Sequence, residues 1–301
     1  MFAITGATGN TGSVVAERLL AHGQKVRVIG RDASRLARLA QKGAEPFTAD
    51  LSDDAALARA FEGAGAVYAM VPPNVSASDV RAYQETVTDS LAAAIRQASV
   101  THVVALSSIG ADKPEGTGPV VGLHNLEQKL NAIAGLHAVY LRAGYFMENT
   151  LPQAEVIRNL GMLAGPLRPD LRLGMIATRD IGAAAAEILR KRDFSGQQSR
   201  ELLGARDLDY REVAAAIGAA IGRPQLAYAQ LPPAQLKPAF TQMGMSGNMA
   251  DLLLEMAEAL NSGYMRALEP RSPANTTPTT YEAFVAEEFV PRFQTRGVGA
   301  S

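Results

Sequence analysis

Residues 4–12, Ile-Thr-Gly-Ala-Thr-Gly-Asn-Thr-Gly, decide the fold of this chain. The apolar segment Phe2–Thr5 before them predicts a short buried strand, and apolar residues at helical spacing after them predict a helix. Gly6 permits a sharp turn off the strand, Gly9 lets a pyrophosphate approach the backbone, and Gly12 lets the helix pack close to the sheet. The helix N-terminus supplies free N–H groups. The pattern predicts a nucleotide-binding turn, and the alternative is a glycine-rich turn without a ligand.

Strands and helices alternate through the first half of the chain. Further strands are predicted at Lys25–Gly30, Glu45–Ala49, Ala66–Val71, His102–Ser108 and Ala138–Arg142. This alternation predicts right-handed βαβ units and therefore a Rossmann-type, doubly wound parallel sheet. Beyond Asn149 the alternation loosens, and from Leu208 on helices dominate, which predicts a smaller, mostly helical C-terminal domain. The last helix is expected to begin with a capping box, Thr279-x-x-Glu282.

The end of the second strand bears on the choice of cofactor. In dinucleotide-binding folds an acidic residue at this point selects NAD, whereas an arginine accommodates the 2′-phosphate of NADP. Arg31 directly follows the strand and Arg35 lies one helical turn further on, so both guanidinium groups are within reach of a phosphate. Asp32 is better interpreted as the N-cap of the next helix. The position favours NADP(H), and the alternative is that the two arginines are a solvated surface pair.

The predicted cofactor contacts lie at the ends of successive strands. They are Gly6, Thr8, Gly9, Asn10, Thr11, Gly12, Arg31, Arg35, Asp50, Leu51, Val71, Pro72 and Ser107. Asp50 is either a polar turn residue or a contact to the adenine edge. We expect an NADP-binding Rossmann domain over residues 1–147, with residues 172–204 packing back on it. A smaller, partly interleaved substrate-binding domain is expected over residues 148–301.

Composition limits the partners that the chain can have. The 29 basic and 30 acidic residues give a net charge of -1, which offers no electrostatic case for binding nucleic acid or an anionic membrane. Cysteine is absent, which excludes disulfides and thiolate catalysis and fits a reducing compartment. No apolar stretch approaches the ~20 residues of a membrane span. Because histidines and carboxylates show no metal-ligand spacing, we expect no metal. The expected location is the cytoplasm, and a homodimer is a possible assembly.

Several short motifs together resemble a known family. They are Gly6–Gly12, Gly30–Asp32, Ala49–Leu51, Val71–Pro73, Ser107–Gly110, Leu141–Asn149, Ile176–Ile181 and Pro278–Phe284. This set is similar to the NmrA-like branch of the atypical short-chain dehydrogenase/reductase superfamily. The resemblance implies an NADP-binding domain, a small C-terminal substrate domain and a cleft between them. Members of the branch include NAD(P)H-dependent quinone and azo-compound reductases, and also NADP-binding redox sensors and transcription co-regulators.

The chain departs from the superfamily at its catalytic acid. That acid is a tyrosine in Tyr-x-x-x-Lys, yet no tyrosine lies between Tyr83 and Tyr140, and the spacing that ends at Lys129 begins at Asn125. The usual alcohol–ketone proton relay is therefore missing. His124 is the most plausible local proton donor, and Lys129 contacts the nicotinamide ribose or nothing; these two are the predicted catalytic residues.

Three further residues are predicted to contact a substrate. Tyr145, Phe146 and Asn149 follow the sixth strand, at the carboxyl end of the sheet where ligands bind, although packing between domains explains them equally well. The leading hypothesis is an NADPH-dependent oxidoreductase that reduces quinone-like or other conjugated small-molecule acceptors by hydride transfer. The alternative is a non-catalytic NADP(H)-binding redox sensor or regulator of the NmrA type.

Overall fold

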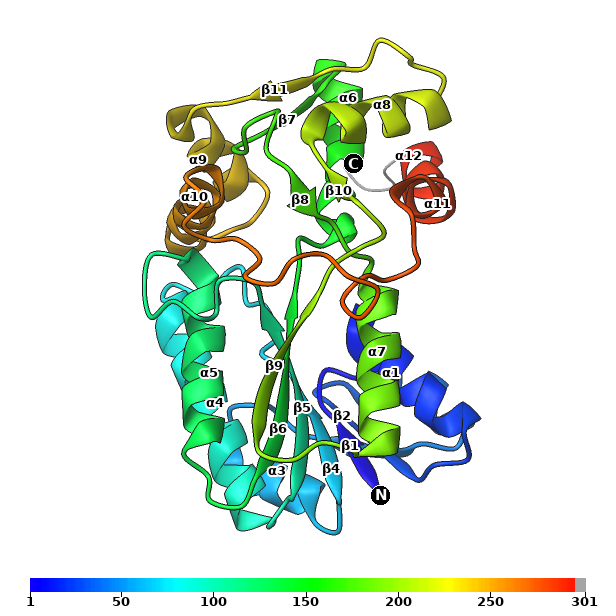
Figure 1. The fold of residues 1–301 in the computed structure, drawn as a ribbon, viewed down its shortest axis with the longest axis vertical. Helices are drawn as coiled ribbons and strands as arrows, with labels where there is room; N and C mark the ends of the chain where they lie inside the picture. The colour runs from blue at the N-terminus through cyan, green and yellow to red at the C-terminus, as the bar shows by residue number, and fades with distance from the viewer. Residues whose placement is uncertain (296–301) are drawn as a thin grey trace.

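A seven-stranded parallel sheet forms the centre of the protein in the computed structural model, which describes residues 1–295 (Figure 1). Its strands are β1 (Phe2–Ile4), β2 (Val26–Gly30), β3 (Glu45–Thr48), β4 (Ala66–Ala69), β5 (His102–Ser108), β6 (His137–Ala143) and β9 (Gln197–Leu202). The strand order is β3-β2-β1-β4-β5-β6-β9, so the order along the chain reverses between β1 and β4. Ligands of such sheets bind at this reversal, outside the carboxyl ends of the strands.

Helices cover both faces of the sheet. One face carries α1 (Asn10–Ala21), α2 (Ala33–Gln41) and α7 (Thr178–Lys191), and the other carries α3 (Asp54–Phe61), α4 (Val80–Gln97) and α5 (Val121–Asn131). Because side chains of a strand alternate between the two faces, Ile4 packs with the first set and Ala3 with the second. The predicted doubly wound Rossmann-type sheet is confirmed.

The second half of the chain adds a smaller unit with its own apolar core. Its helices are α6 (Gln153–Leu160), α8 (Tyr210–Ala220), α9 (Pro233–Gln242), α10 (Gly247–Asn261), α11 (Tyr281–Phe284) and α12 (Val290–Gln294). Its strands are β7 (Leu163–Gly165), β8 (Leu173–Gly174), β10 (Asp207–Leu208) and β11 (Tyr228–Gln230), and 3-10 turns lie at Gly118–Val120 and Met147–Thr150. A π-helical turn, Val285–Phe289, joins α11 to α12. Between residues 1 and 295, no helix combines the length and apolar character that a membrane crossing requires.

A long non-helical segment, residues 262–280, joins α10 to α11 and crosses between the two halves of the molecule (orange in Figure 1). We call it the strap. The buried carboxylate of Glu201, on β9, accepts hydrogen bonds from the backbone N–H of Leu268 (2.8 Å) and of Glu269 (3.0 Å). Leu203 also pairs with the strap through an isolated bridge to Thr276. The last strand of the sheet therefore holds the strap in place.

The start of α11 differs from the expected capping box. Thr280 is the N-cap, and its side chain accepts a hydrogen bond from the backbone N–H of Ala283. Thr279 instead donates both its backbone N–H and its hydroxyl to the carboxylate of Asp180, each over 2.9 Å. Asp180 lies in the first turn of α7 and is buried. Thr279 therefore binds this distant carboxylate and does not cap α11 as the local pattern predicted.

The two neighbouring threonines should differ in their effect on stability. Thr280→Ala removes an exposed N-cap and should lower the free energy of unfolding by about 1 kcal/mol. Thr279→Ala leaves the buried Asp180 carboxylate without its hydroxyl donor and should cost about 1–3 kcal/mol. Urea denaturation of both variants measures the difference. A larger loss for Thr280→Ala would contradict this assignment of the cap.

Candidate functional site

The glycine turn leaves no room for side chains between β1 and α1. Gly6 has a φ of +59°, in the left-handed region that favours glycine. A Cβ atom on Gly12 would lie 2.3 Å from the Gly6 carbonyl oxygen, so only glycine fits there. The first backbone N–H paired within the helix is that of Ser13, which donates to the Gly9 oxygen over 3.1 Å. The N–H groups of residues 10–12 therefore have no acceptor within the helix and form a site suited to phosphate.

Some of the predicted cofactor contacts near this turn can offer a ligand only their backbone, whereas others can also offer a side chain. The Thr11 hydroxyl is buried and accepts a hydrogen bond from Tyr68 over 2.9 Å, so only the backbone of Thr11 is available to a ligand. Leu51 is likewise buried, and its side chain packs in the core. Thr8 is half-buried, whereas Asn10 is exposed at the start of the helix. The structure brings all of these predicted residues to the strand ends, but with different groups facing outward.

The end of β2 gathers the groups expected for an adenosine phosphate. Arg31 is exposed, and no acid within residues 1–295 forms an ion pair with its guanidinium. Asp50 accepts hydrogen bonds from the backbone N–H of Ser52 (2.9 Å) and from its hydroxyl (2.7 Å). These bonds, with the charge of Arg31, hold the pKa of Asp50 below its usual value. Asp50 thus shapes a turn with one oxygen, which leaves its other oxygen available to a ligand.

Tyr83 was not expected at this site. It is half-buried on α4, and burial raises its phenol pKa, while the nearby charge of Arg31 lowers that pKa and the charge of Asp50 raises it. The charges of both residues therefore act on the Tyr83 phenol. The helical period of α4 predicts that Tyr83 faces inward, but not which strand end it reaches. Asp32 caps α2 as expected, and Arg35 is exposed in the first turn of that helix.

A cavity of about 540 Å³ opens at the carboxyl ends of β4, β5 and β6. Predicted cofactor contacts Val71, Pro72 and Ser107 line it, together with the predicted substrate contacts Tyr145, Phe146 and Asn149. The opposite wall comes from the second half of the chain, with Met249 and Met256 of α10 and several residues of the strap. A volume of this size is typical of small-molecule sites.

The structure does not bring the two predicted catalytic residues to this cavity. The Nδ1 atom of His124 lies 2.8 Å from the Ala111 carbonyl oxygen, and His124 is not among the lining residues. Lys129 lies 2.7 Å from Glu85 Oε1 and also 2.7 Å from Asp89 Oδ1, both on α4. Lys129 is therefore held by acids on the neighbouring helix, away from the strand ends.

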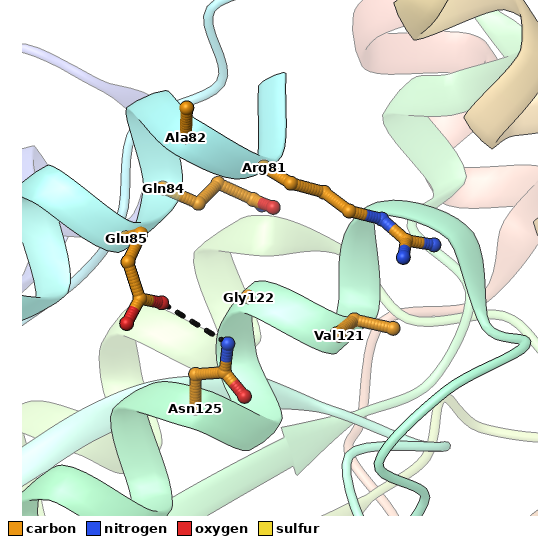
Figure 2. Close-up of a pocket in the computed structure, with 7 residues that line it drawn as sticks. All are labelled: Arg81, Ala82, Gln84, Glu85, Val121, Gly122 and Asn125. Carbon is orange, nitrogen blue, oxygen red and sulfur yellow. Dashed lines mark hydrogen bonds between the residues drawn. The ribbon is translucent and has the colours of Figure 1, made fainter. Parts of the chain in front are cut away.

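The register of α5 explains this outcome. Figure 2 shows Asn125 directed toward Glu85 of α4, within a separate pocket of about 280 Å³ between the two helices. Asn125 and Lys129 are four residues apart and so share that face of α5. The face toward the end of β5 carries Leu123, which lines the main cavity, and Glu127. In this chain the tyrosine–lysine arrangement of the superfamily is thus absent from both faces.

A buried ion pair lies beneath the cavity. Glu127 is 3% exposed and accepts hydrogen bonds from Arg142 on β6, Nε to Oε1 over 3.0 Å and Nη2 to Oε2 over 2.6 Å. The Ser107 hydroxyl donates to Glu127 Oε1 over 2.6 Å. These bonds to Glu127 raise the pKa of Arg142. The neighbouring Ser108 hydroxyl donates to the Ile109 carbonyl oxygen over 2.9 Å, so the hydrogens of both serines are already engaged.

Phenol groups cluster on the other side of the cavity. Tyr210, buried at the start of α8, donates a hydrogen bond to the Tyr145 hydroxyl over 3.3 Å. Burial raises the pKa of Tyr145, so its phenol stays protonated at neutral pH. The Tyr145 ring therefore forms an uncharged part of the wall.

The strand reversal, the glycine turn and the helix N-terminus beside it define a Rossmann-type dinucleotide-binding fold. The chain belongs to the NmrA-like family, whose sequence model matches residues 1–289, and the predicted family is confirmed.

Relatives and solved structures cover most of the chain. The NAD(P)H azoreductase of Xenophilus azovorans is 30% identical over 278 residues, which is 92% of this chain and 93% of that protein. Quinone oxidoreductase 2 of Escherichia coli is 28% identical over 270 residues, 87% of this chain and 89% of that protein. The crystal structure of an Escherichia coli NADPH-dependent quinone oxidoreductase complexed with NADPH is similar with a TM-score of 0.75 and 26% identity. That similarity covers 89% of this chain and 91% of the other.

The ion pair beneath the cavity should behave as a unit. Glu127→Leu leaves the Arg142 guanidinium without its acid and should lower the free energy of unfolding by about 3–5 kcal/mol. The double variant Glu127→Leu, Arg142→Met removes both charges and should regain most of that loss, since paired buried charges can be replaced by apolar groups at little cost. Urea denaturation measures both. Equal losses in the single and double variants would show that the two charges are not coupled.

Proposed function

We propose that this protein is an NADPH-dependent oxidoreductase that reduces quinone-like or other conjugated acceptors by hydride transfer. The observation that carries the proposal is the cavity of about 540 Å³, which joins the strand ends of a dinucleotide-binding sheet to an apolar wall from a second unit. Such a cavity can hold a flat acceptor beside a cofactor ring and exclude water. The azoreductase and quinone oxidoreductase activities of the relatives support it.

The residues at the strand ends fit NADP(H). The free N–H groups of residues 10–12 would hold the pyrophosphate, because a helix N-terminus attracts anions. Arg31 would bind the 2′-phosphate, with Arg35 one turn further along α2, and Tyr83 would cover the adenine. Val71, Pro72 and Ser107 would border the nicotinamide end, since they line the cavity. The bound cofactor supplies the hydride.

The contribution of the chain itself is binding, orientation and exclusion of water. Tyr145, Phe146 and the methionines of α10 would hold the acceptor ring, and thioether side chains adapt to flat ligands. The hydrogens of Ser107 and Ser108 are donated within the protein, and α5 presents Leu123 to the cavity in place of an acid. A reduced quinone oxygen would therefore take its proton from water, and the oxidation of simple alcohols, which needs a base, should be very slow.

The missing acid also supports the alternative of a non-catalytic NADP(H)-dependent regulator, which the experiment below separates from the enzyme. We further propose that residues 1–147, with residues 172–204 returning to them, form the cofactor-binding domain, and that the remainder from residue 148 forms the substrate-binding domain. The pairing of β6 with β9 and the packing of α7 on α1 support this division. A cytoplasmic location, and action as a monomer or homodimer on a small molecule without nucleic acid or membrane, complete the proposal.

Steady-state NADPH oxidation with a panel of quinones tests the proposed function. We expect oxidation to accelerate with at least one quinone, and secondary alcohols with NADP⁺ to give no useful rate. His124→Ala shows in the same assay whether His124 is a proton donor. Because His124 lies outside the cavity, its loss should lower the turnover number by less than about tenfold. Tight NADPH binding without any acceptor-dependent oxidation would overturn the enzyme proposal and favour the regulator.

A further inference from the structure

Ser107 lines the cavity but can offer a ligand there only a hydrogen-bond acceptor. It ends β5, is 2% exposed and lines the cavity, and its Oγ atom lies 2.6 Å from Glu127 Oε1. Arg142 holds both oxygens of Glu127, and a carboxylate paired in this way accepts hydrogen bonds but donates none. The Ser107 hydrogen must therefore point to Glu127. What remains for a ligand is the lone pairs of the oxygen.

This polarity does not suit the acceptor. Quinone oxygens and azo nitrogens are themselves hydrogen-bond acceptors, so an oxygen with only lone pairs cannot bind them. The carboxamide of nicotinamide, in contrast, carries two N–H donors. Ser107 also lies on the strand next to β4, whose following residues Val71 and Pro72 border the same cavity. Rossmann-type sheets bind the cofactor in the crevice at these strand ends.

We propose that Ser107 accepts a hydrogen bond from the carboxamide N–H of bound nicotinamide, and that the Glu127–Arg142 ion pair positions the Ser107 hydroxyl for this contact. Ser107 is then a cofactor-orienting residue and not a proton donor to the substrate. The inference rests on the NADP(H) site of the proposed function, but it does not depend on which acceptor the protein reduces.

The acetylpyridine analogue of NADPH isolates this hydrogen bond, because a methyl group replaces the NH₂ group of the carboxamide. The carbonyl attached to the ring and both riboses remain. Calorimetry with NADPH and the reduced analogue gives the ratio of their dissociation constants. One neutral hydrogen bond is worth roughly a three- to tenfold ratio, so the wild-type protein should prefer NADPH by about that factor. Ser107→Ala should reduce the preference to less than about twofold, by weakening NADPH binding alone.

Ser108→Ala is the matched control. Ser108 is the next residue and also lines the cavity, and its hydroxyl donates to a carbonyl oxygen, that of Ile109. It should keep the wild-type preference for NADPH. An unchanged preference in Ser107→Ala would overturn the inference, as would a wild-type protein that binds NADPH and the analogue equally. Failure to bind NADPH at all would instead overturn the proposed function, together with this inference.

Glu127→Gln tests the positioning role separately. A glutamine amide can donate to Ser107 Oγ, which frees the serine hydrogen to turn toward the cavity. The preference for NADPH over the analogue should then fall or reverse, whereas a merely structural role would weaken both ligands equally. Thermal unfolding of the variant shows whether it is folded. If it is not, the comparison of Ser107→Ala with Ser108→Ala decides the inference alone.

Discussion

The close contact of α1 with the end of β1 is the constraint on which the rest of the structure depends. A Cβ on Gly12 would lie 2.3 Å from the Gly6 oxygen and 3.0 Å from the Thr5 oxygen. The helix N-terminus is therefore placed directly at the strand reversal between β1 and β4. Helix α7 packs just as closely against α1, because a Cβ on Gly182 of α7 would lie 2.8 Å from the Thr11 oxygen of α1. Glycines in both helices thus allow the returning segment of the chain to pack on the first βα unit.

The packing of α7 also holds the second unit against the cavity. Glu148, in the turn after β6, accepts hydrogen bonds from the Thr178 backbone N–H (2.9 Å) and hydroxyl (2.6 Å) at the start of α7. Asp180, in the same first turn, binds Thr279 near the end of the strap. The loop that carries Tyr145 to Asn149 and the strap are consequently attached to one helix end. Two opposite walls of the cavity are therefore fixed to the same end of α7.

Local patterns predicted much of the cofactor side. The glycine spacing, the Asp32 cap and the position of Arg31 depend on neighbours within a few residues, and the structure has each of them as expected. Tyr145, Phe146 and Asn149 were also expected at the carboxyl end of the sheet, because the end of a parallel strand is recognisable from its apolar run, and all three line the cavity. These features follow from short-range rules of turn and helix geometry.

The hydrogen bonds among Ser107, Glu127 and Arg142 beneath the cavity could not be predicted from local patterns. Ser107 and Arg142 are neighbours because the register of β5 and β6 pairs their Cα positions, and Glu127 reaches both from a helix. Neither the register nor the rotation of α5 is visible in sequence spacing. The spacing to Lys129 therefore suggested the wrong face of that helix, where Glu85 and Asp89 hold the lysine. Thr279 was misassigned for the same reason, since its partner Asp180 lies 99 residues away.

The central claim is that the constrained turn and Arg31 together build a site for the phosphates of NADP(H). Calorimetric comparison of NADPH with NADH tests it most directly, because the two ligands differ only in the 2′-phosphate. A charge-assisted contact is worth about 1.5–3 kcal/mol, so NADPH should bind at least about tenfold more tightly than NADH. Arg31→Glu should abolish or reverse this preference. Equal affinities in the wild-type protein would contradict the account.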